Sequence, residues 1–312
     1  MANKEKNFAS AVIYVHNAEN RIDEFLKTIV RVMEENFEHS EIICVNDASE
    51  DDSLSVIKKA SNFATITSVS VVNMSYFHGL ELSMNAGTDM AIGDFVFEFD
   101  NTCLDFDPMT IIDIYKCSLK GYDIVSASAD RKEKLTSLLF YKVFDRYTEL
   151  SYKMSTESFR VLSRRVINRI SSMNKTIPYR KAVYANCGLK TCNIKYKVTN
   201  DTPHVYDKKE KNFRTSLAEN SLILFTEVGY RFAKTMTIFM MLVSIFMLIY
   251  SIAIYVTSHP VAGWTTTILF LSVAFWGLFG ILTIIIKYLQ LIVDLVFKRK
   301  HYTFESIEKL TK

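Results

Sequence analysis

The first hundred residues of the 312-residue chain contain three mostly apolar runs, and each run is followed by side chains that carry oxygen or nitrogen. They are Ala9–Val15, followed by His16 and Asn17, Glu41–Val45, followed by Asn46 and Asp47, and Phe95–Phe99, followed by Asp100. Carboxylate and amide groups can bind a ribose or a base edge, or a divalent cation that bridges a diphosphate. A sugar nucleotide presents all of these groups, so the three positions predict a nucleotide-sugar site. The glycine-rich sequences G-x-G-x-x-G and G-x-x-x-x-G-K-[ST] are absent, which argues against dinucleotide and P-loop sites.

The residues between these runs follow helical periodicity. After the first run, apolar side chains recur at steps of three and four residues from Ile22 to Met33. Further helices are predicted over 53–60, 80–91 and 109–119, and further strands over 66–72 and 124–126. This alternation predicts an α/β fold with a doubly wound, mostly parallel sheet. Such sheets bind ligands beyond the carboxyl ends of their strands, so the polar residues above are expected to line one cleft.

Two long uncharged runs stand near the end of the chain. No charged residue occurs from Thr235 to Ser258, or from Pro260 to Ile286. Each run is long enough to cross roughly 30 Å of hydrocarbon, so two transmembrane helices are predicted, over about 235–257 and 264–286. A buried helical hairpin in a soluble core is the alternative. Lys and Arg flank the pair but are absent from its short link, which predicts a multi-pass protein of the inner (plasma) membrane with both termini cytoplasmic.

These features divide the chain into four parts. Residues 1–207 are expected to form a cytoplasmic catalytic domain, and 208–234 an amphipathic helix in the headgroup plane. The two spans occupy 235–286, and 287–312 is expected to be a juxtamembrane tail. For the segment 208–234, a solvated charge run before an ordinary helix is the alternative.

The composition excludes several classes of protein. Thirty-seven basic and 34 acidic residues give a net charge of +3, too balanced for a protein that binds mainly nucleic-acid phosphates. The five cysteines form no C-x-x-C pair, which argues against a metal clip or a disulfide scaffold and favours a reducing compartment.

Several segments of the chain, in this order, resemble the motifs of family 2 glycosyltransferases. The matching segments are Ile13–Glu19, Val45–Asp51, Gly79–Glu81, Asn85–Gly87, Gly93–Asp94, Phe99–Thr102, Ser158–Arg165 and Gly263–Thr265. Val45–Asp51 stands for V-D-D-G-S-x-D, Phe99–Thr102 covers the D-x-D, and Ser158–Arg165 is close to D-F-R-L-L-S-R-R. With the two trailing spans, the chain most resembles the polyprenyl-phosphate glycosyltransferases, the dolichol-phosphate mannose synthase-like group.

The resemblance implies a GT-A fold and an inverting transfer from a nucleotide sugar to polyprenyl (undecaprenyl) phosphate, for cell-surface polysaccharide or glycan modification. It implies catalytic roles for Asp100, Glu157 and Arg160, and nucleotide binding by Asn17, Glu19, Asn46, Asp47, Ser49 and Asp100. Acceptor phosphate binding would fall to Arg131, Arg160, Lys211 and Arg214. Asp100 would bind Mg²⁺ or Mn²⁺, with Asp105 as a second candidate. Because Thr102 replaces the second D-x-D aspartate, this binding is expected to be weak and to depend on the donor.

Some alternatives stay open at this point. A paralogue that has lost turnover, and acts as a lipid-phosphate binder or partner protein, would carry the same fold and anchor. Asp107, before Pro108, suits a helix N-cap as well as a metal site. His16 and His78 suit ordinary packed or solvated histidines better than catalytic ones. A homo-oligomer is an open expectation, and no nucleic-acid partner is expected.

Overall fold

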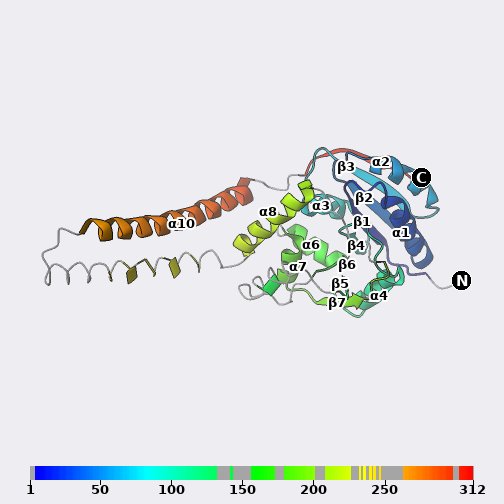
Figure 1. Cartoon of the computed structure of the whole chain (residues 1–312). Coiled ribbons are helices and arrows are strands. Elements are labelled where there is room, and N and C mark those ends of the chain that lie inside the picture. Colours follow the sequence, from blue (N-terminus) through cyan, green and yellow to red (C-terminus); the bar gives the residue numbers. More distant parts are fainter. Residues whose placement is uncertain are drawn as a thin grey trace. The chain divides into compact units, whose positions relative to one another are not determined.

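The computed structural model describes residues 4–131, 141–142, 156–172, 179–200, 208–225, 263–297 and 302–311, with a few single positions between 232 and 246. The chain forms two compact units, one of residues 1–145, 149–217 and 299–312 and another of residues 146–148 and 218–298. All of the strands named below belong to the first unit (Figure 1).

The first unit is built on an eight-stranded mixed sheet with the order β7-β5-β6-β4-β1-β2-β3-β8. The strands are β1 (Ala9–Val15), β2 (Ser40–Asn46), β3 (Ser68–Met74), β4 (Phe95–Phe99), β5 (Ile124–Ala129), β6 (Phe159–Ser163), β7 (Thr191–Tyr196) and β8 (Phe304–Lys309). Strands β3, β2, β1 and β4 run parallel, as does the pair β5 and β7. Strand β6 is antiparallel to β4 and β5, and β8 is antiparallel to β3. The parallel half of the sheet confirms the sequence prediction, whereas the antiparallel strands were not predicted.

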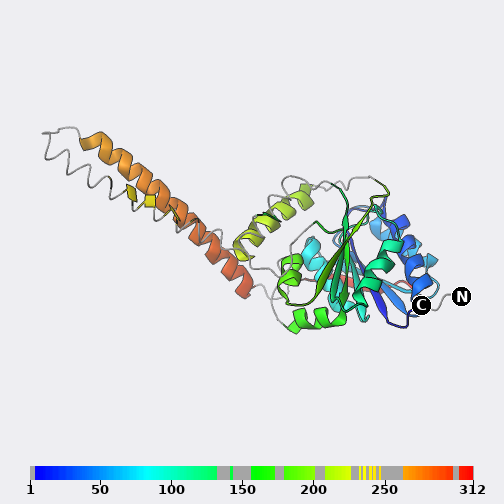
Figure 2. The same cartoon turned by 90° about the horizontal axis from the view of Figure 1, so that it is seen from below.

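Helices cover both faces of this sheet (Figure 2). They are α1 (Ile22–Asn36), α2 (Ser53–Ala60), the 3₁₀ turn η1 (Ser61–Phe63), α3 (Leu80–Met90), α4 (Met109–Ser118), α6 (Arg164–Ser172) and α7 (Arg180–Asn186). Strand β1 shows why two layers are needed, because all seven of its residues are buried and successive side chains point to opposite faces. Ala11 and Ile13 belong to the core that α1, α2 and α4 cover. Val12 and Tyr14 belong to the core that α3, α6 and α7 cover.

The last described residues return to the sheet as its edge strand. Strand β8 pairs with β3, and the Thr311 hydroxyl accepts a hydrogen bond from the Val69 amide at 2.8 Å. The sequence prediction assigned this segment to a juxtamembrane tail and missed the strand. The physical reason is that Phe304, Ile307 and the charged residues around them are largely exposed, so the segment lacks the apolar alternation of a half-buried strand.

Two further helices lie between β7 and β8 in the sequence, α8 (Lys208–Phe225) and α10 (Gly263–Phe297). Helix α8 starts where the amphipathic segment was predicted. The second predicted span, 264–286, lies within α10, and the first lies almost wholly outside the described residues. Taking the described residues alone, no helix is both long enough and apolar enough to cross a membrane, so the two predicted spans are not confirmed.

Candidate active site

The polar residues that follow β1, β2 and β4 lie at one edge of the sheet. Val15 pairs with Asn46 of β2, and Ile13 pairs with Phe99 of β4. Because the three strands are parallel and adjacent, the residues after them meet at the carboxyl edge, where doubly wound sheets bind ligands. The structure thus brings together the predicted nucleotide-binding residues Asn17, Glu19, Asn46, Asp47, Ser49 and Asp100.

Three of these residues make hydrogen bonds between the loop after β1 and the loop after β2. The Asn17 side-chain oxygen accepts a hydrogen bond from the Glu50 amide at 2.9 Å, and the Asn17 amide donates to the Ser49 hydroxyl at 3.1 Å. A Glu19 carboxylate oxygen accepts from the Asp52 amide at 3.1 Å. The contacts of these residues with a nucleotide remain predictions. The contacts that the structure shows are between the loop after β1 and the loop after β2.

Asp47, predicted to bind the nucleotide, has its carboxylate engaged within the protein. Its carboxylate is fully buried and accepts three hydrogen bonds, from the Tyr14 hydroxyl at 3.0 Å and from the amides of His78 and Gly79 at 2.8 Å each. Gly79 precedes α3 and has φ of +80°. The carboxylate therefore fixes the start of α3 against the end of β2, and the geometry favours this role over a direct contact with ribose.

The two histidines near this edge are packed against the chain, as the alternative for them proposed. The His16 Nδ1 atom lies 2.7 Å from the Asp47 carbonyl oxygen, which makes Nδ1 the protonated nitrogen. The His78 Nδ1 atom lies 2.5 Å from the Tyr76 carbonyl oxygen, and its Nε2 atom accepts from the Thr303 amide at 3.2 Å. In both rings the hydrogen-bonding groups are used within the protein.

A buried cluster of charges stands beside Asp100. The Arg160 guanidinium, fully buried, contacts three carboxylates, with N–O distances of 2.7 Å to Glu98, 2.8 Å to Asp100 and 3.2 Å to Glu157. The Arg180 guanidinium, 1% exposed, lies 2.8 Å from Glu98, 2.8 Å from Asp100 and 3.0 Å from Glu81. Glu98 and Asp100 thus bridge the two arginines.

The neighbouring opposite charges keep Asp100, Arg160 and Arg180 ionised despite their burial. Burial alone would raise the pKa of Asp100, but the guanidinium charges of Arg160 and Arg180 outweigh it and hold that pKa well below its usual range. Burial opposes the charge on each arginine, and the surrounding carboxylates more than compensate, so both pKa values lie well above the ordinary one. Burial and the Glu98 charge together raise the pKa of Tyr184, whose hydroxyl donates to Glu98 at 2.8 Å. Asp100 is therefore ionised throughout the physiological range, and both arginines stay charged.

The four predicted acceptor residues do not lie together in the described structure. Arg160 is buried in the cluster, so it presents no surface to a lipid phosphate in this arrangement, and its geometry is that of a residue that positions carboxylates. Arg131 is exposed, with its guanidinium 3.9 Å from the Asp105 carboxylate. Lys211 and Arg214 are exposed on α8. Only these last three are placed where an external phosphate could reach them.

The donor groups around Asp100 do not fit a divalent cation. Each of its two oxygens already accepts a hydrogen bond from a guanidinium at 2.8 Å. Thr102 is buried and brings no carboxylate. Asp105 accepts from the Tyr196 hydroxyl at 2.9 Å and faces Arg131. Among the described residues, no group of three or more histidine, cysteine or acidic side chains could hold a metal ion.

Local contacts explain two further residues, Asp107, which was predicted to cap a helix, and Arg164. The Asp107 side chain accepts from the Met109 amide at 2.9 Å, which is the N-cap role. Arg164 donates from Nε to the Gly93 carbonyl at 2.9 Å and from Nη2 to the Ala91 carbonyl at 2.8 Å, so the first of the two arginines after Ser163 is structural.

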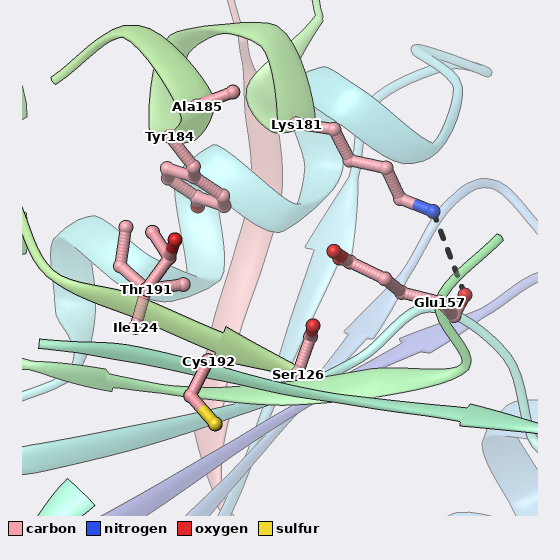
Figure 3. A pocket seen from close by; sticks show the side chains of 8 residues that line it. All are labelled: Ile124, Ser126, Glu157, Lys181, Tyr184, Ala185, Thr191 and Cys192. Carbon is pink, nitrogen blue, oxygen red and sulfur yellow. Dashed lines mark hydrogen bonds between the residues drawn. The ribbon is translucent and has the colours of Figure 1, made fainter. Parts of the chain in front are cut away.

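A small cavity is lined in part by Glu157 and Tyr184, which contact Arg160 and Glu98 of the charge cluster. Figure 3 shows the side chains around it. It is lined by Ile124, Ser126, Glu157, Lys181, Tyr184, Ala185, Thr191 and Cys192. Lys181 reaches across from α7, and its ammonium donates to the Glu157 carbonyl oxygen at 3.5 Å. The cavity holds about 10 Å³, the space of about a single water molecule, so a sugar cannot enter it.

Glu81, Glu98 and Arg180 were missed by the sequence prediction. Glu98 did offer a signal, because it is the one charged residue in the otherwise apolar run Phe95–Phe99. A carboxylate in a buried strand needs a partner of opposite charge. Its partner Arg180 could not be identified in this way, because nothing in the sequence links the two positions.

The sheet and its helices are also found in solved glycosyltransferase structures. The glucosyl-3-phosphoglycerate synthase from Mycobacterium tuberculosis, in complex with phosphoglyceric acid, superposes with a TM-score of 0.53 at 14% identity, over 70% of this chain and 78% of that one. The mannosyltransferase PcManGT from Pyrobaculum calidifontis, in complex with GDP-Man and Mn²⁺, gives 0.50 at 15% identity, over 70% and 63%. These likenesses show the fold alone, a GT-A-like mixed α/β sheet.

Three curated relatives extend the comparison in sequence. The uncharacterized glycosyltransferase sll0501 of Synechocystis is 30% identical over 185 residues, 57% of each chain. The uncharacterized glycosyltransferase YkcC of Bacillus subtilis is 24% identical over 272 residues, 83% of this chain and 81% of that one. A prophage bactoprenol glucosyl transferase homolog of Escherichia coli is 29% identical over 197 residues, 60% of this chain and 62% of that one. The chain thus spans less than two thirds of the length of the first and the third.

The family itself follows from a match in sequence over about half of the chain. The sequence profile of Glycosyl transferase family 2 matches residues 10–170, more than half of the 312 residues. The matched range includes β1, β2 and β4, with the acidic and amide side chains at their carboxyl ends, and the Arg160 segment of β6. The chain belongs to glycosyl transferase family 2.

Proposed function

We propose that this protein transfers a sugar from a nucleotide sugar to a polyprenyl phosphate at a membrane surface, in the modification of cell-surface polysaccharide or other glycans. The observation that carries the proposal is the meeting of Asn17, Asn46 and Asp100 at one sheet edge in a family 2 glycosyltransferase. The lipid acceptor is supported by relatives whose names describe bactoprenol glucosyl transferases, at 28–29% identity.

The proposed transfer depends more on binding and orienting the acceptor phosphate than on proton transfer by a base. A phosphate monoester is already an anion near neutral pH, so its oxygen can attack the sugar carbon with little help from a base, and orientation dominates. Exposed Arg131, Lys211 and Arg214 supply cationic groups that could hold such an anion. The buried arginines fix Asp100 at the sheet edge with defined orientation and permanent charge.

Membrane anchoring is part of the proposal and has its own support. The runs 235–258 and 260–286 carry no charged residue. Strand β8, after these runs, pairs with β3, which precedes them. One folded sheet cannot lie on both sides of a bilayer. If the intervening segment enters the membrane, it must therefore cross an even number of times, which agrees with a two-helix hairpin and with both termini in the cytoplasm.

A cysteine placed at His259 tests this topology. We expect the His259→Cys variant, made in a chain without its five native cysteines, to react with an impermeant thiol reagent added to intact cells. Glu305→Cys, on the exposed side of β8, is the matched control and is expected to react only after permeabilisation. Labelling of both positions only after permeabilisation would contradict the hairpin.

Two observations favour a second candidate function. Thr102 stands in place of the second D-x-D carboxylate, and both oxygens of Asp100 are taken by arginines. These features suit a paralogue that keeps the fold and binds a lipid phosphate without turnover. An assay of nucleoside diphosphate release by membranes that contain the protein distinguishes the two functions. We expect nucleoside diphosphate release from at least one nucleotide sugar in a panel, stimulated by undecaprenyl phosphate, whereas the paralogue would release none.

A further inference from the structure

The two guanidinium groups stand where a cation would be bound. The Arg160 Nη2 atom lies 2.8 Å from Asp100 Oδ2, and the Arg180 Nη2 atom lies 2.8 Å from Asp100 Oδ1. Both distances are those of charge-assisted hydrogen bonds. A divalent cation at this carboxylate would have to share it with two fixed positive charges.

Both arginines are held in place by further carboxylates. The Glu98 Oε2 atom lies 2.7 Å from Arg160 Nη1 and 2.8 Å from Arg180 Nη1. On the outer side, Glu157 contacts the Arg160 Nε atom at 3.2 Å and Glu81 contacts the Arg180 Nε atom at 3.0 Å. Each guanidinium therefore has three carboxylate partners, so neither can swing away without leaving buried charge uncompensated.

Glu98 is itself fixed on its other oxygen. Glu98 Oε1 accepts from the Tyr184 hydroxyl at 2.8 Å and from the Thr88 hydroxyl at 3.1 Å. Glu98, Arg160 and Arg180 are at most 1% exposed. The cluster is thus a built and rigid structure beneath Asp100, and it is separate from the exposed cations proposed for the acceptor.

We propose that Arg160 and Arg180 take the place of a divalent cation at Asp100, and that nucleotide binding by this protein does not depend on a divalent cation. The two arginines are positioning residues, since they reach the site through Asp100. The inference rests on the proposed function, because it presumes that a nucleotide diphosphate binds at the sheet edge.

Calorimetry on the purified full chain tests the inference. UDP and GDP are the probes, and each is titrated in EDTA and in about 1 millimolar Mn²⁺, the upper end of the dissociation constants of weak divalent sites. We expect the affinity for whichever nucleotide binds to differ less than about tenfold between the two media. Asp100→Asn is expected to leave this ratio unchanged, as is the control Asp113→Asn, at an exposed position of α4. A gain of tenfold or more in Mn²⁺ would overturn the inference. Failure of UDP and GDP to bind in either medium, with the same failure of ADP, CDP and dTDP, would overturn the proposed function, and the inference with it.

A charge-balanced double variant tests whether Arg180 prevents a divalent cation from binding at Asp100. Glu98→Gln with Arg180→Gln removes one negative and one positive charge and frees the Asp100 Oδ1 atom. We expect this variant to bind Mn²⁺ in the presence of nucleotide at least tenfold more tightly than the parent, as measured by the loss of free Mn²⁺ signal in electron paramagnetic resonance. No gain in a variant with the parent's circular dichroism spectrum would contradict the role given to Arg180. If the variant does not fold, the wild-type titrations still decide the inference.

Discussion

Arg180→Ala is expected to lower the free energy of unfolding by about 3–5 kcal/mol, because it leaves buried carboxylates without a compensating charge. Glu81, Glu98 and Asp100 each lose a guanidinium at 2.8–3.0 Å. Urea-induced unfolding of the purified chain, followed by circular dichroism, measures the change. The matched control is Arg165→Ala, whose side chain is 69% exposed and 3.5 Å from Asp123; its expected effect is below about 0.5 kcal/mol.

The same variant is expected to show a change in pH dependence. In the wild-type protein the pKa of Asp100 is lowered, so its contribution to stability is present above the ordinary value of about 3.9 and is lost only as the pH falls through the lower folded value. Between pH 8 and pH 5, Asp100 therefore adds no pH dependence. Without Arg180 one of the guanidinium charges that lower the pKa of Asp100 is lost, so that pKa rises and protonation of Asp100 relieves part of the charge imbalance. The loss of unfolding free energy caused by Arg180→Ala should therefore be smaller at pH 5 than at pH 8. An equal loss at both pH values would contradict this account of the cluster.

Asp47→Ala is expected to cost about 3–5 kcal/mol of stability, since it leaves the Tyr14 hydroxyl and the amides of His78 and Gly79 without their acceptor. Asp47→Asn retains one acceptor oxygen and should cost less. Thermal unfolding of the purified chain compares these variants with Asp52→Ala, where the side chain is exposed and makes no capping hydrogen bond.

The result also separates two roles for Asp47. If Asp47 is mainly a nucleotide ligand, as the sequence alone suggested, Asp47→Ala would keep the wild-type unfolding midpoint and lose affinity for UDP or GDP. A midpoint unchanged within error would thus refute the structural role. We expect instead a large fall in the midpoint, with Asp52→Ala unaffected.

The parallel half of the sheet could be predicted from sequence because its pattern is local. Strands β1 and β4 were located at their observed limits, since each is an apolar run closed by polar residues. Strands β6 and β7 carry weaker patterns, and their antiparallel or distant pairing depends on contacts that no local pattern encodes. Strand β8 is an exposed edge with charged residues, so it had no hydrophobic signature.

The sequence predicted which polar residues meet at one end of the sheet, but not the contacts that they make. Asp47 and Asp100 lie at that end, and Arg160 contacts Asp100. Burial then decided what each of them does, and burial depends on partners far away in the chain. Arg180, 80 residues after Asp100, converts an apparent metal ligand into one member of a buried ion cluster.

The transfer reaction itself is the most direct test of the proposed function. Membranes that contain the full chain are incubated with radiolabelled nucleotide sugars, one at a time, with and without undecaprenyl phosphate, and the lipid extract is counted. We predict that one sugar enters the lipid fraction only when undecaprenyl phosphate is present, and that mild acid releases it. Absence of label from the lipid fraction for every nucleotide sugar, in membranes where the folded protein is present, would contradict the proposed transfer.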